Sequence, residues 1–269
     1  MMINKEINDF YSETSELDRL KYGLGPLEFE RNKELINRYL PETGGIILDI
    51  GGGPGVYSSW LAQQGFEVHL IDPVEKHIEQ ARKKFSKLKN PFTSHLGEAR
   101  KLSFQDDFAD LIIFHGPLYH LQDKKDRIKA LKEAKRVMKT NGIILAFAIS
   151  YTASTLVGLI QGVLTQSDFY KMSMAELQTG IHEAPDSMAG VLPKGYYHRP
   201  EELRSEIEEA GFTHLATLPV EGLIWLDKNY FDTRSDQDKK DRMMKLLLQT
   251  ENDPNLLAFS PHILAIGEK

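Results

Sequence analysis

The chain has 269 residues, a formal net charge of −6 and no cysteine. The lack of cysteine excludes disulfides, thiolate zinc sites and iron–sulfur clusters, and with them cluster-dependent radical reactions and reactions that use a cysteine nucleophile. The acidic balance argues against nucleic acid as a partner, because the phosphate contacts that dominate such binding need clustered lysine and arginine.

The distribution of apolar residues is that of a globular protein. The apolar fraction is 41%, and no stretch approaches the roughly 20 consecutive apolar residues of a membrane span. The N-terminus has no hydrophobic signal core. We therefore expect a cytoplasmic protein without membrane contact, built as one elaborated domain or as one domain with a cap.

Residues 1–40 are predicted to form a helical segment ahead of the first strand. Helical patterns run over residues 11–20 and 28–40, and the apolar residues of the second pattern share one face. Residues 23–26 (Gly-Leu-Gly-Pro) would form a hinge between the two helices.

A glycine-rich turn between two strands is the main functional signal. Residues 46–50 are an apolar, β-branched run that predicts a buried strand, and residues 51–55 (Gly-Gly-Gly-Pro-Gly) predict a turn that a ligand can approach closely. A helix over 56–64 and a strand over 66–71 follow, and the strand ends at Asp72. This order is that of a βαβ nucleotide-binding unit, in which the final acid accepts hydrogen bonds from ribose hydroxyls.

The charge before the turn indicates which nucleotide binds. A dinucleotide would place its pyrophosphate at the start of the following helix, where the carboxylate of Asp49 would repel it. Asp49 instead suits a cationic group such as an amino-acid ammonium. The spacing Gly51-x-Gly53-x-Gly55 also differs from the G-x-G-x-x-G of dinucleotide sites. Both features argue against an NAD-dependent oxidoreductase, which remains the alternative enzyme class.

An acid followed by Gly-x-Gly resembles the first motif of the class I S-adenosylmethionine (SAM)-dependent methyltransferases of the small-molecule type. The resemblance implies SAM as the cofactor. It implies that Asp49 and the backbone of Gly51 and Gly53 hold the methionine part of SAM, and that Asp72, with Pro73 beside it, holds the ribose.

Two later loops extend this resemblance. A helix over 74–88 and a strand over 91–96 lead into the first loop. There the resemblance implies that Glu98 accepts from the adenine amino group and that the backbone N–H of Ala99 meets a ring nitrogen.

The second loop follows a strand over 108–114 and borders the methyl group, because ligands of open α/β sheets sit at the carboxyl ends of the strands. Its sequence Gly-Pro-Leu-Tyr-His-Leu is similar to the corresponding loop of methyltransferases of the glycine N-methyltransferase kind, in which a histidine helps to wall the cofactor. His120 matches that position, and His115 and Tyr119 lie near it. Each of the three side chains could instead make only a structural hydrogen bond.

The remaining pattern completes a doubly wound sheet. A turn at residues 141–142 (Asn-Gly) leads into a strand over 143–149, and a helix that begins at Pro200 leads into a strand over 212–220. By the resemblance, a last strand over 260–267 pairs antiparallel beside it. The sequence therefore predicts an α/β protein with a seven-stranded, mostly parallel, Rossmann-like sheet.

We assign residues 41–150 and 198–269 to this core and residues 151–197 to an insertion after the fifth strand. The insertion is interpreted as a helical cap over the substrate, or alternatively as a structural or dimer-forming insert. The side chains that would set specificity in a cap are Phe169, Tyr170, His182, Tyr196 and Tyr197. The resemblance implies that residues 1–40 form a lid over the cofactor with Tyr11 and Arg19, although packing and surface roles are equally open for both.

The sequence thus predicts methyl transfer from SAM to nitrogen or oxygen of a small molecule. The protein mainly aligns the acceptor, and a hydroxyl acceptor also needs a base within hydrogen-bond reach. The candidate bases are His115, Tyr119, His120 and His198, and the sequence does not choose among them. No metal-ligand spacing is evident at this loop, so no metal is expected. A SAM-binding protein without catalysis, a peptide acceptor and any oligomeric state remain open.

Overall fold

The computed structural model describes residues 5–13, 16–42, 44–188, 190–227, 229 and 235–269. Its centre is a seven-stranded sheet with the strand order β3-β2-β1-β4-β5-β9-β8, in which only β9 runs antiparallel to its neighbours. The predicted fold class, including the antiparallel last strand, is therefore confirmed. The strands are β1 Ile46–Ile50, β2 Glu67–Asp72, β3 Thr93–Leu96, β4 Ala109–Phe114, β5 Met138–Ile149, β8 Thr213–Pro219 and β9 His262–Glu268.

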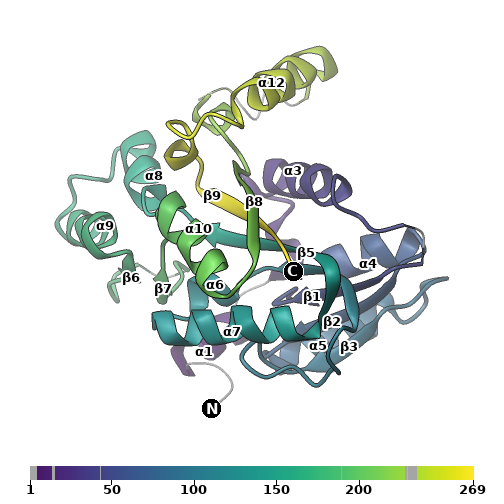
Figure 1. Cartoon of the computed structure of the whole chain (residues 1–269). Coiled ribbons are helices and arrows are strands. Elements are labelled where there is room, and N and C mark those ends of the chain that lie inside the picture. The colour runs from purple at the N-terminus through teal and green to yellow at the C-terminus, as the bar shows by residue number, and fades with distance from the viewer. Residues whose placement is uncertain (1–4, 14–15, 43, 189, 228, 230–234) are drawn as a thin grey trace.

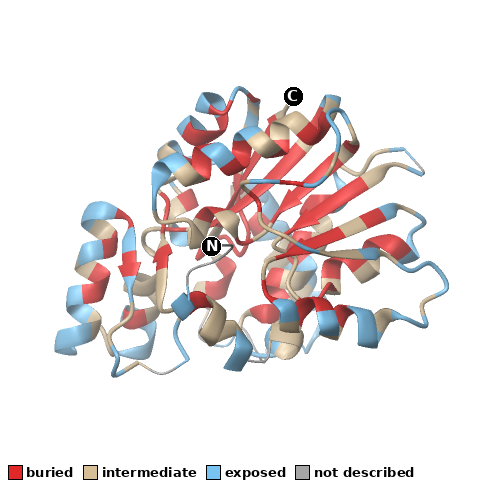
Figure 2. Ribbon diagram, turned by 90° about the horizontal axis from the view of Figure 1, so that it is seen from below, coloured by how far each residue is buried: buried red, intermediate tan, exposed pale blue. Residues whose placement is uncertain are grey.

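Helices cover both faces of this sheet (Figure 1). Because side chains alternate along a strand, Ile47 and Leu48 enter different cores. Ile47 packs in the core beneath α3 and α4, with α5 against β2 beside them, whereas Leu48 packs in the core beneath α7 and α10. The bounds are α3 Gly25–Asn37, α4 Val56–Gln63, α5 Glu75–Phe85, α7 Lys124–Val137 and α10 Pro200–Glu209. The buried residues accordingly concentrate on the strands and on the inner sides of the helices (Figure 2).

Two local predictions differ from the structure. The helix expected over residues 11–20 is divided into α1 (Lys5–Glu13) and α2 (Glu16–Arg19), and residues 14–15 lie outside the described part. Asn141 and Gly142 do not end the preceding helix in a turn but lie inside β5. Asn141 has a φ of +63°, which asparagine tolerates well, and the pairing of β5 with β4 shifts there as in a β-bulge.

The insertion holds two helices and a small sheet, α8 Ala153–Gln161, α9 Ser167–Thr179, β6 Ile181–Glu183 and β7 Lys194–Tyr196. Strand β7 pairs antiparallel with β6. The guanidinium of Arg127 on α7 stacks 3.7 Å from the ring of Tyr196 and ties this small sheet to the core. In Figure 1, α8 and α9 lie at the opposite end of the molecule from α4 and α5.

The C-terminal part before β9 packs against the N-terminal part. It comprises η1 Ile224–Leu226, α12 Gln237–Thr250 and η2 Leu257–Phe259. Leu247 of α12 is buried with Ile224 and Trp225 and with Leu27 of α3. Arg31 of α3 is fully buried and pairs with Glu251 just after α12. Over the described residues, no helix is both long and apolar enough to cross a membrane.

Candidate active site

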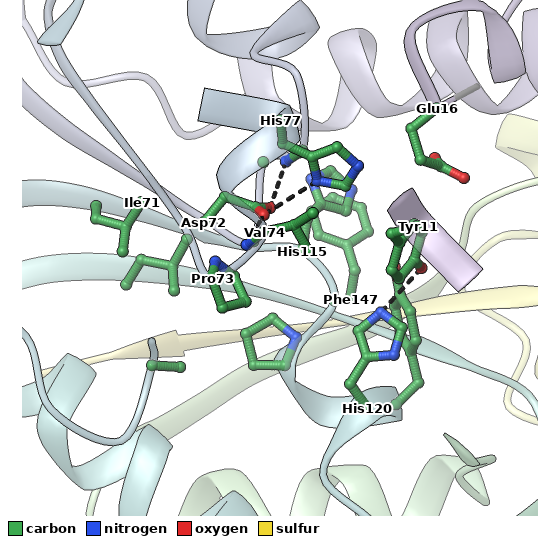
Figure 3. Close-up of a pocket in the computed structure, with 18 of the residues that line it drawn as sticks. Tyr11, Glu16, Ile71, Asp72, Pro73, Val74, His77, His115, His120 and Phe147 are labelled. Atoms are coloured by element: carbon green, nitrogen blue, oxygen red, sulfur yellow. Dashed lines mark hydrogen bonds and ion pairs between the residues drawn. The ribbon is translucent and has the colours of Figure 1, made fainter. Parts of the chain in front are cut away.

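A cavity of about 500 Å³ lies at the carboxyl ends of the central strands, within the range of small-ligand sites. The glycine turn after β1 forms one side together with the end of β2, where Ile71 and Asp72 lie (Figure 3). The ends of β4 and β5 and the start of β9 form the other, and the N-terminal segment closes it. The predicted residues that line it are Tyr11, Arg19, Gly51, Gly53, Asp72, Pro73, Glu98, Ala99, His115, Tyr119 and His120.

Asp49 lies behind the glycine turn and is not part of the cavity wall. Its carboxylate is fully buried against Gly52, and its Oδ2 accepts a hydrogen bond of 2.6 Å from the hydroxyl of Ser58. Its Oδ1 has no hydrogen-bond partner among the described residues. Burial raises the pKa of Asp49 to about 6, although the hydrogen bond from Ser58 opposes the shift. The structure therefore separates Asp49 from the cavity by the backbone of the turn, which the sequence did not anticipate.

Asp72 holds the glycine turn and the next helix together. Its Oδ2 accepts from the backbone N–H of Gly53 at 2.9 Å. Its Oδ1 accepts from the backbone N–H of Val74 at 2.9 Å and lies 3.0 Å from Nδ1 of His77 (Figure 3). A carboxylate has about four acceptor positions, so three bonds leave one for a ligand hydroxyl. Asp72 can thus accept one hydrogen bond from a ribose hydroxyl while its other bonds hold the glycine turn in place.

The N-terminal segment lies over the cavity, as a lid would. The hydroxyl of Tyr11 on α1 is 3.0 Å from Nε2 of His120, and its ring meets that of His77 edge-on at 5.3 Å (Figure 3). Lys76 of α5 donates to the backbone oxygen of Ser12 at 2.7 Å. Burial raises the pKa of Tyr11 well above its usual value, so its hydroxyl stays protonated and can donate.

Arg19 lines the same cavity but is held by two carboxylates. Its guanidinium donates two hydrogen bonds to Glu28 at 2.7 and 2.8 Å, and one to Glu16 at 3.0 Å. Burial alone would raise the pKa of Glu28, but Arg19 outweighs it and lowers that pKa to about 2. The N-terminal segment is therefore attached to α3 by a charge-assisted pair inside the cavity wall.

The loop after β3, which the sequence assigned to adenine, contains an ion pair of its own. The carboxylate of Glu98 accepts from Nε of Arg100 at 2.7 Å, and Arg100 also pairs with Asp126 at 2.5 Å. Glu98 thus turns toward a cation on its own loop. Ala99 is nearly buried and packs in the core below.

The histidines of the loop after β4 are weak bases. His115 is stacked between Tyr57 and Phe147, with ring centroids 5.0 and 3.8 Å away. Burial lowers the pKa of His115 to about 3 and that of His120 to about 4, so both are neutral near pH 7 and hold a proton poorly. Burial also raises the pKa of Tyr119 far above its usual value. None of the three is well suited to take a proton at neutral pH.

His198, the fourth candidate base, lies outside the cavity wall. It is fully buried, and its Nε2 is 3.3 Å from Glu206, which also pairs with Arg127 at 2.7 Å. Burial would raise the pKa of Glu206, but His198 and Arg127 outweigh it and lower that pKa to about 2. His198 is thus part of a buried ion network between α7 and α10, and the structure contradicts its prediction as a base at the site.

Replacing His198 should therefore affect stability and leave the cavity intact. We expect His198→Leu, which removes one partner of a buried carboxylate, to lower the free energy of unfolding by about 1–3 kcal/mol. Cofactor affinity should not change. Urea denaturation and calorimetric titration measure the two effects, and His214→Leu on β8, at a partly exposed histidine, is the control. A large loss of cofactor affinity with unchanged stability would show that His198 does act at the site.

The insertion contributes less to the cavity than a cap would. Among the described residues 153–197, Leu192 is the one that lines the cavity. His182 is fully buried, stacks on Tyr197 at 4.5 Å and contacts Glu176 at 2.6 Å. The aromatic and polar residues proposed for specificity thus pack within the insertion, against the core or at the surface.

Several cavity residues escaped the sequence analysis. Glu28 and Asn32 come from α3, His77 from α5, and His262 from the start of β9. No local motif marks them. The antiparallel last strand must begin at the edge where the parallel strands end, and this geometry is the signal that could have indicated His262.

Three of the charged groups could in principle hold a metal ion. Glu28, Glu221 and His262 bring ligand atoms within 4.8 Å of one another, a grouping found in the described part of the chain. Arg19 already pairs with both oxygens of Glu28, however, and Glu221 with His262. The expectation of no metal stays a prediction.

Unsatisfied polar atoms in the cavity wall fit a polar ligand. Nε2 of His77, Nδ1 of His115, Nδ1 of His120 and Oδ1 of Asn32 are buried and have no hydrogen-bond partner among the described residues. Buried polar atoms are rarely left without partners in folded proteins. Hydroxyl, amine and carboxylate groups of a nucleoside linked to an amino acid could satisfy them, so the site fits SAM.

Comparisons with known proteins agree with this site. Residues 48–146 match the model of a family described as a methyltransferase domain. A putative methyltransferase of Bacillus subtilis, YqeM, is 36% identical over 111 residues, which cover 41% of this chain and 44% of that protein, less than half its length. The ubiquinone/menaquinone biosynthesis C-methyltransferase UbiE of Rickettsia bellii is 28% identical over 202 residues, covering 68% of this chain and 74% of that protein.

Solved structures share the fold. A SAM-dependent methyltransferase from Methanosarcina mazei superimposes with a TM-score of 0.61 at 19% identity, covering 87% of this chain and 96% of that chain. The family match spans the glycine turn, the second acid and the loop after β4, which all line the cavity. Residues 48–146 thus match a methyltransferase domain, in a chain that has the fold of class I SAM-dependent methyltransferases, whose cofactor is SAM.

Proposed function

We propose that the protein transfers a methyl group from SAM to a small molecule held in the same cavity. The observation that carries this proposal is one continuous cavity, from the glycine turn and the end of β2 to the ends of β4 and β5 and the start of β9. The first side suits the nucleoside and amino-acid parts of SAM. The second side supplies walls of His115, Phe147 and Ile149 for an acceptor.

On the cofactor side, we assign each residue a role from the hydrogen bonds that it can still make. Asp72 has one free acceptor position for a ribose hydroxyl, and Tyr11 can donate from the lid. The negative charge of Asp49 acts through the glycine turn on the cationic end of the methionine part, because a low dielectric preserves its field. Bound SAM supplies a methyl group that its sulfonium has already activated. The protein's own contribution is to align the acceptor with that group and to exclude water.

On the acceptor side, nitrogen and oxygen are the atoms that the sequence favoured. The relative UbiE is named a C-methyltransferase, so a carbon acceptor also enters the proposal. Whichever of the three atoms accepts the methyl group, the acceptor molecule should be small and largely apolar, because the lid closes the cavity and aromatic rings line it. The cytoplasmic location, the exclusion of nucleic acid and the cap role of residues 151–197 stay predictions.

A titration followed by an acceptor screen tests this function. We expect calorimetry to detect micromolar binding of SAM and of S-adenosylhomocysteine, and no comparable binding of NADH. Protein with methyl-labelled SAM should then label at least one compound in a set of phenols, amines and carbon acids. Tight NADH binding without SAM binding would leave the oxidoreductase alternative in place. Binding of SAM without labelling of any acceptor would favour a cofactor-binding protein without catalysis.

A further inference from the structure

A buried carboxylate and a histidine form a pair on the acceptor side of the cavity. Nδ1 of His262 is 2.6 Å from Oε1 of Glu221, which is fully buried in the segment after β8. Oε2 of Glu221 accepts from the hydroxyl of Ser260 at 2.9 Å and from the backbone N–H of His262 at 3.0 Å. These three contacts hold Glu221 in one orientation, and Glu221 in turn fixes the ring of His262.

The other ring nitrogen of His262 is available to a ligand. Because Nδ1 donates to Glu221, Nε2 carries the lone pair or the second proton, and no hydrogen bond to Nε2 is found among the described residues. His262 lines the cavity with 29% of its side chain accessible, and it lies opposite Ile149 of β5. The orientation of a histidine by a buried carboxylate is the arrangement that general bases use.

We propose that His262, oriented by Glu221, is the general base for a hydroxylated aromatic acceptor; this inference rests on the function proposed above. In the step, the acceptor's hydroxyl proton moves to Nε2 of His262. A lone pair of that oxygen, or of the ring carbon it activates, forms the bond to the methyl carbon as the carbon–sulfur bond breaks and leaves its electron pair on sulfur. A ring carbon that bonds the methyl group then loses its own proton to restore the aromatic ring.

The surroundings of His262 favour a hydroxyl over an amine. Burial alone would lower the pKa of His262, but Glu221 and then Glu28 of α3 outweigh it and raise that pKa to about 9, while Arg19 of α2 opposes them. His115, the other titratable ring nearby, is neutral. His262 is therefore mostly protonated near pH 7, and its neutral fraction is the base that takes the proton of a phenol, which titrates near 10. Its protonated form attracts a phenolate and repels an ammonium.

The shape of the wall agrees with an aromatic ring. Tyr57, His115 and Phe147 are stacked in sequence, and all three line the cavity together with His262. Aromatic side chains gain favourable energy from offset stacking on another ring. A planar acceptor on this wall can direct its hydroxyl toward the charged group formed by His262 and Glu28.

The proposal can be tested by absorbance, without turnover. The probe is 4-nitrophenol, whose phenolate absorbs visible light, added to the complex of the protein with S-adenosylhomocysteine. We expect saturable binding, and a pKa of the bound probe about one unit lower than in buffer, because the imidazolium pairs with the phenolate. His262→Gln should abolish this shift. Glu221→Gln should reduce it, because the imidazolium loses its counter-charge. His214→Gln, away from the cavity, should leave it unchanged.

Each contrary result has a separate meaning. Calorimetry with S-adenosylhomocysteine comes first for every variant; if the unmodified protein does not bind it, the proposed function itself fails. If it binds but 4-nitrophenol does not saturate, a hydroxylated aromatic acceptor is ruled out. Equal ionisation in the unmodified protein and in His262→Gln would exclude His262 as the base. Retained S-adenosylhomocysteine binding in both variants excludes unfolding as the cause of a lost shift.

Discussion

Gly51→Ala should reduce the affinity for SAM by about 100-fold or more, equivalent to roughly 3 kcal/mol. Gly51 has a φ of +77°, a region that costs alanine about 1–2 kcal/mol. A methyl group there would also overlap the backbone oxygen of His115 and approach Cδ of Pro117 at 3.0 Å. Since backbone rather than a flexible side chain blocks the space, the turn itself must move, and with it the wall that receives the cofactor. Calorimetric titration with SAM measures the loss.

Gly65→Ala is the control that distinguishes the steric clash of Gly51→Ala from the cost of alanine at a positive φ. Gly65 ends the α4 segment with a φ of +95°, and a methyl group there meets no atom within 4 Å. We expect this control to lower the free energy of unfolding by about 1 kcal/mol and to leave SAM affinity unchanged. Equal losses of affinity in both variants would mean that the clash at Gly51 is not the cause of the weaker binding.

Asp49→Asn should stabilise the free protein and weaken SAM binding. The raised pKa of Asp49, about 6 against 3.8, means that its charged form is disfavoured in the fold by roughly 3 kcal/mol. Asparagine keeps the bond to Ser58 but leaves one buried amide group unsatisfied, so the net gain near pH 7 should be about 1–2 kcal/mol. The cationic cofactor loses its counter-charge, so affinity should fall tenfold or more. Thermal unfolding and calorimetry measure the two effects.

The effect of Asp49→Asn on stability should depend on pH in a defined direction. Because the folded pKa of Asp49 lies above its unfolded value, its contribution to stability is present below about pH 4 and is lost as the pH rises through about 6. The stability difference between Asp49→Asn and the unmodified protein should therefore grow over this interval. Asp110→Asn is the opposite control, because Asp110 pairs with Lys139 and its pKa is lowered. A destabilising Asp49→Asn at pH 7 would contradict the assigned cost of the buried charge.

The core could be predicted from sequence because its signals are local. The strand at residues 46–50 matches β1, since an apolar run between a glycine pair and a glycine turn allows few other structures. The strands β6 and β7 have three residues each, too few to show a periodicity, and were missed. The placement of the glycine turn, Asp72 and the lid at one cavity likewise followed from motif and resemblance.

The acceptor side could not be predicted in the same way. Glu28, Glu221 and His262 lie far apart in sequence and meet only because α3 and the antiparallel β9 converge on the edge where β4 and β5 end. His198 was a candidate base in the sequence, yet in the structure it is buried beside Glu206, which pairs with Arg127. Titratable residues reveal a site only once tertiary structure shows which of them face a cavity and which face each other.

The contacts of the N-terminal segment could make the exchange rate of the cofactor independent of its affinity. Tyr11 contacts His120, Lys76 donates to the backbone of Ser12, and Arg19 pairs with Glu28, so the lid is fastened at three points around the cavity. If these contacts close the way out of the cavity, their opening sets the residence time of the cofactor independently of its own contacts. We therefore expect substitutions at these contacts, remote from the methyl group, to accelerate product release.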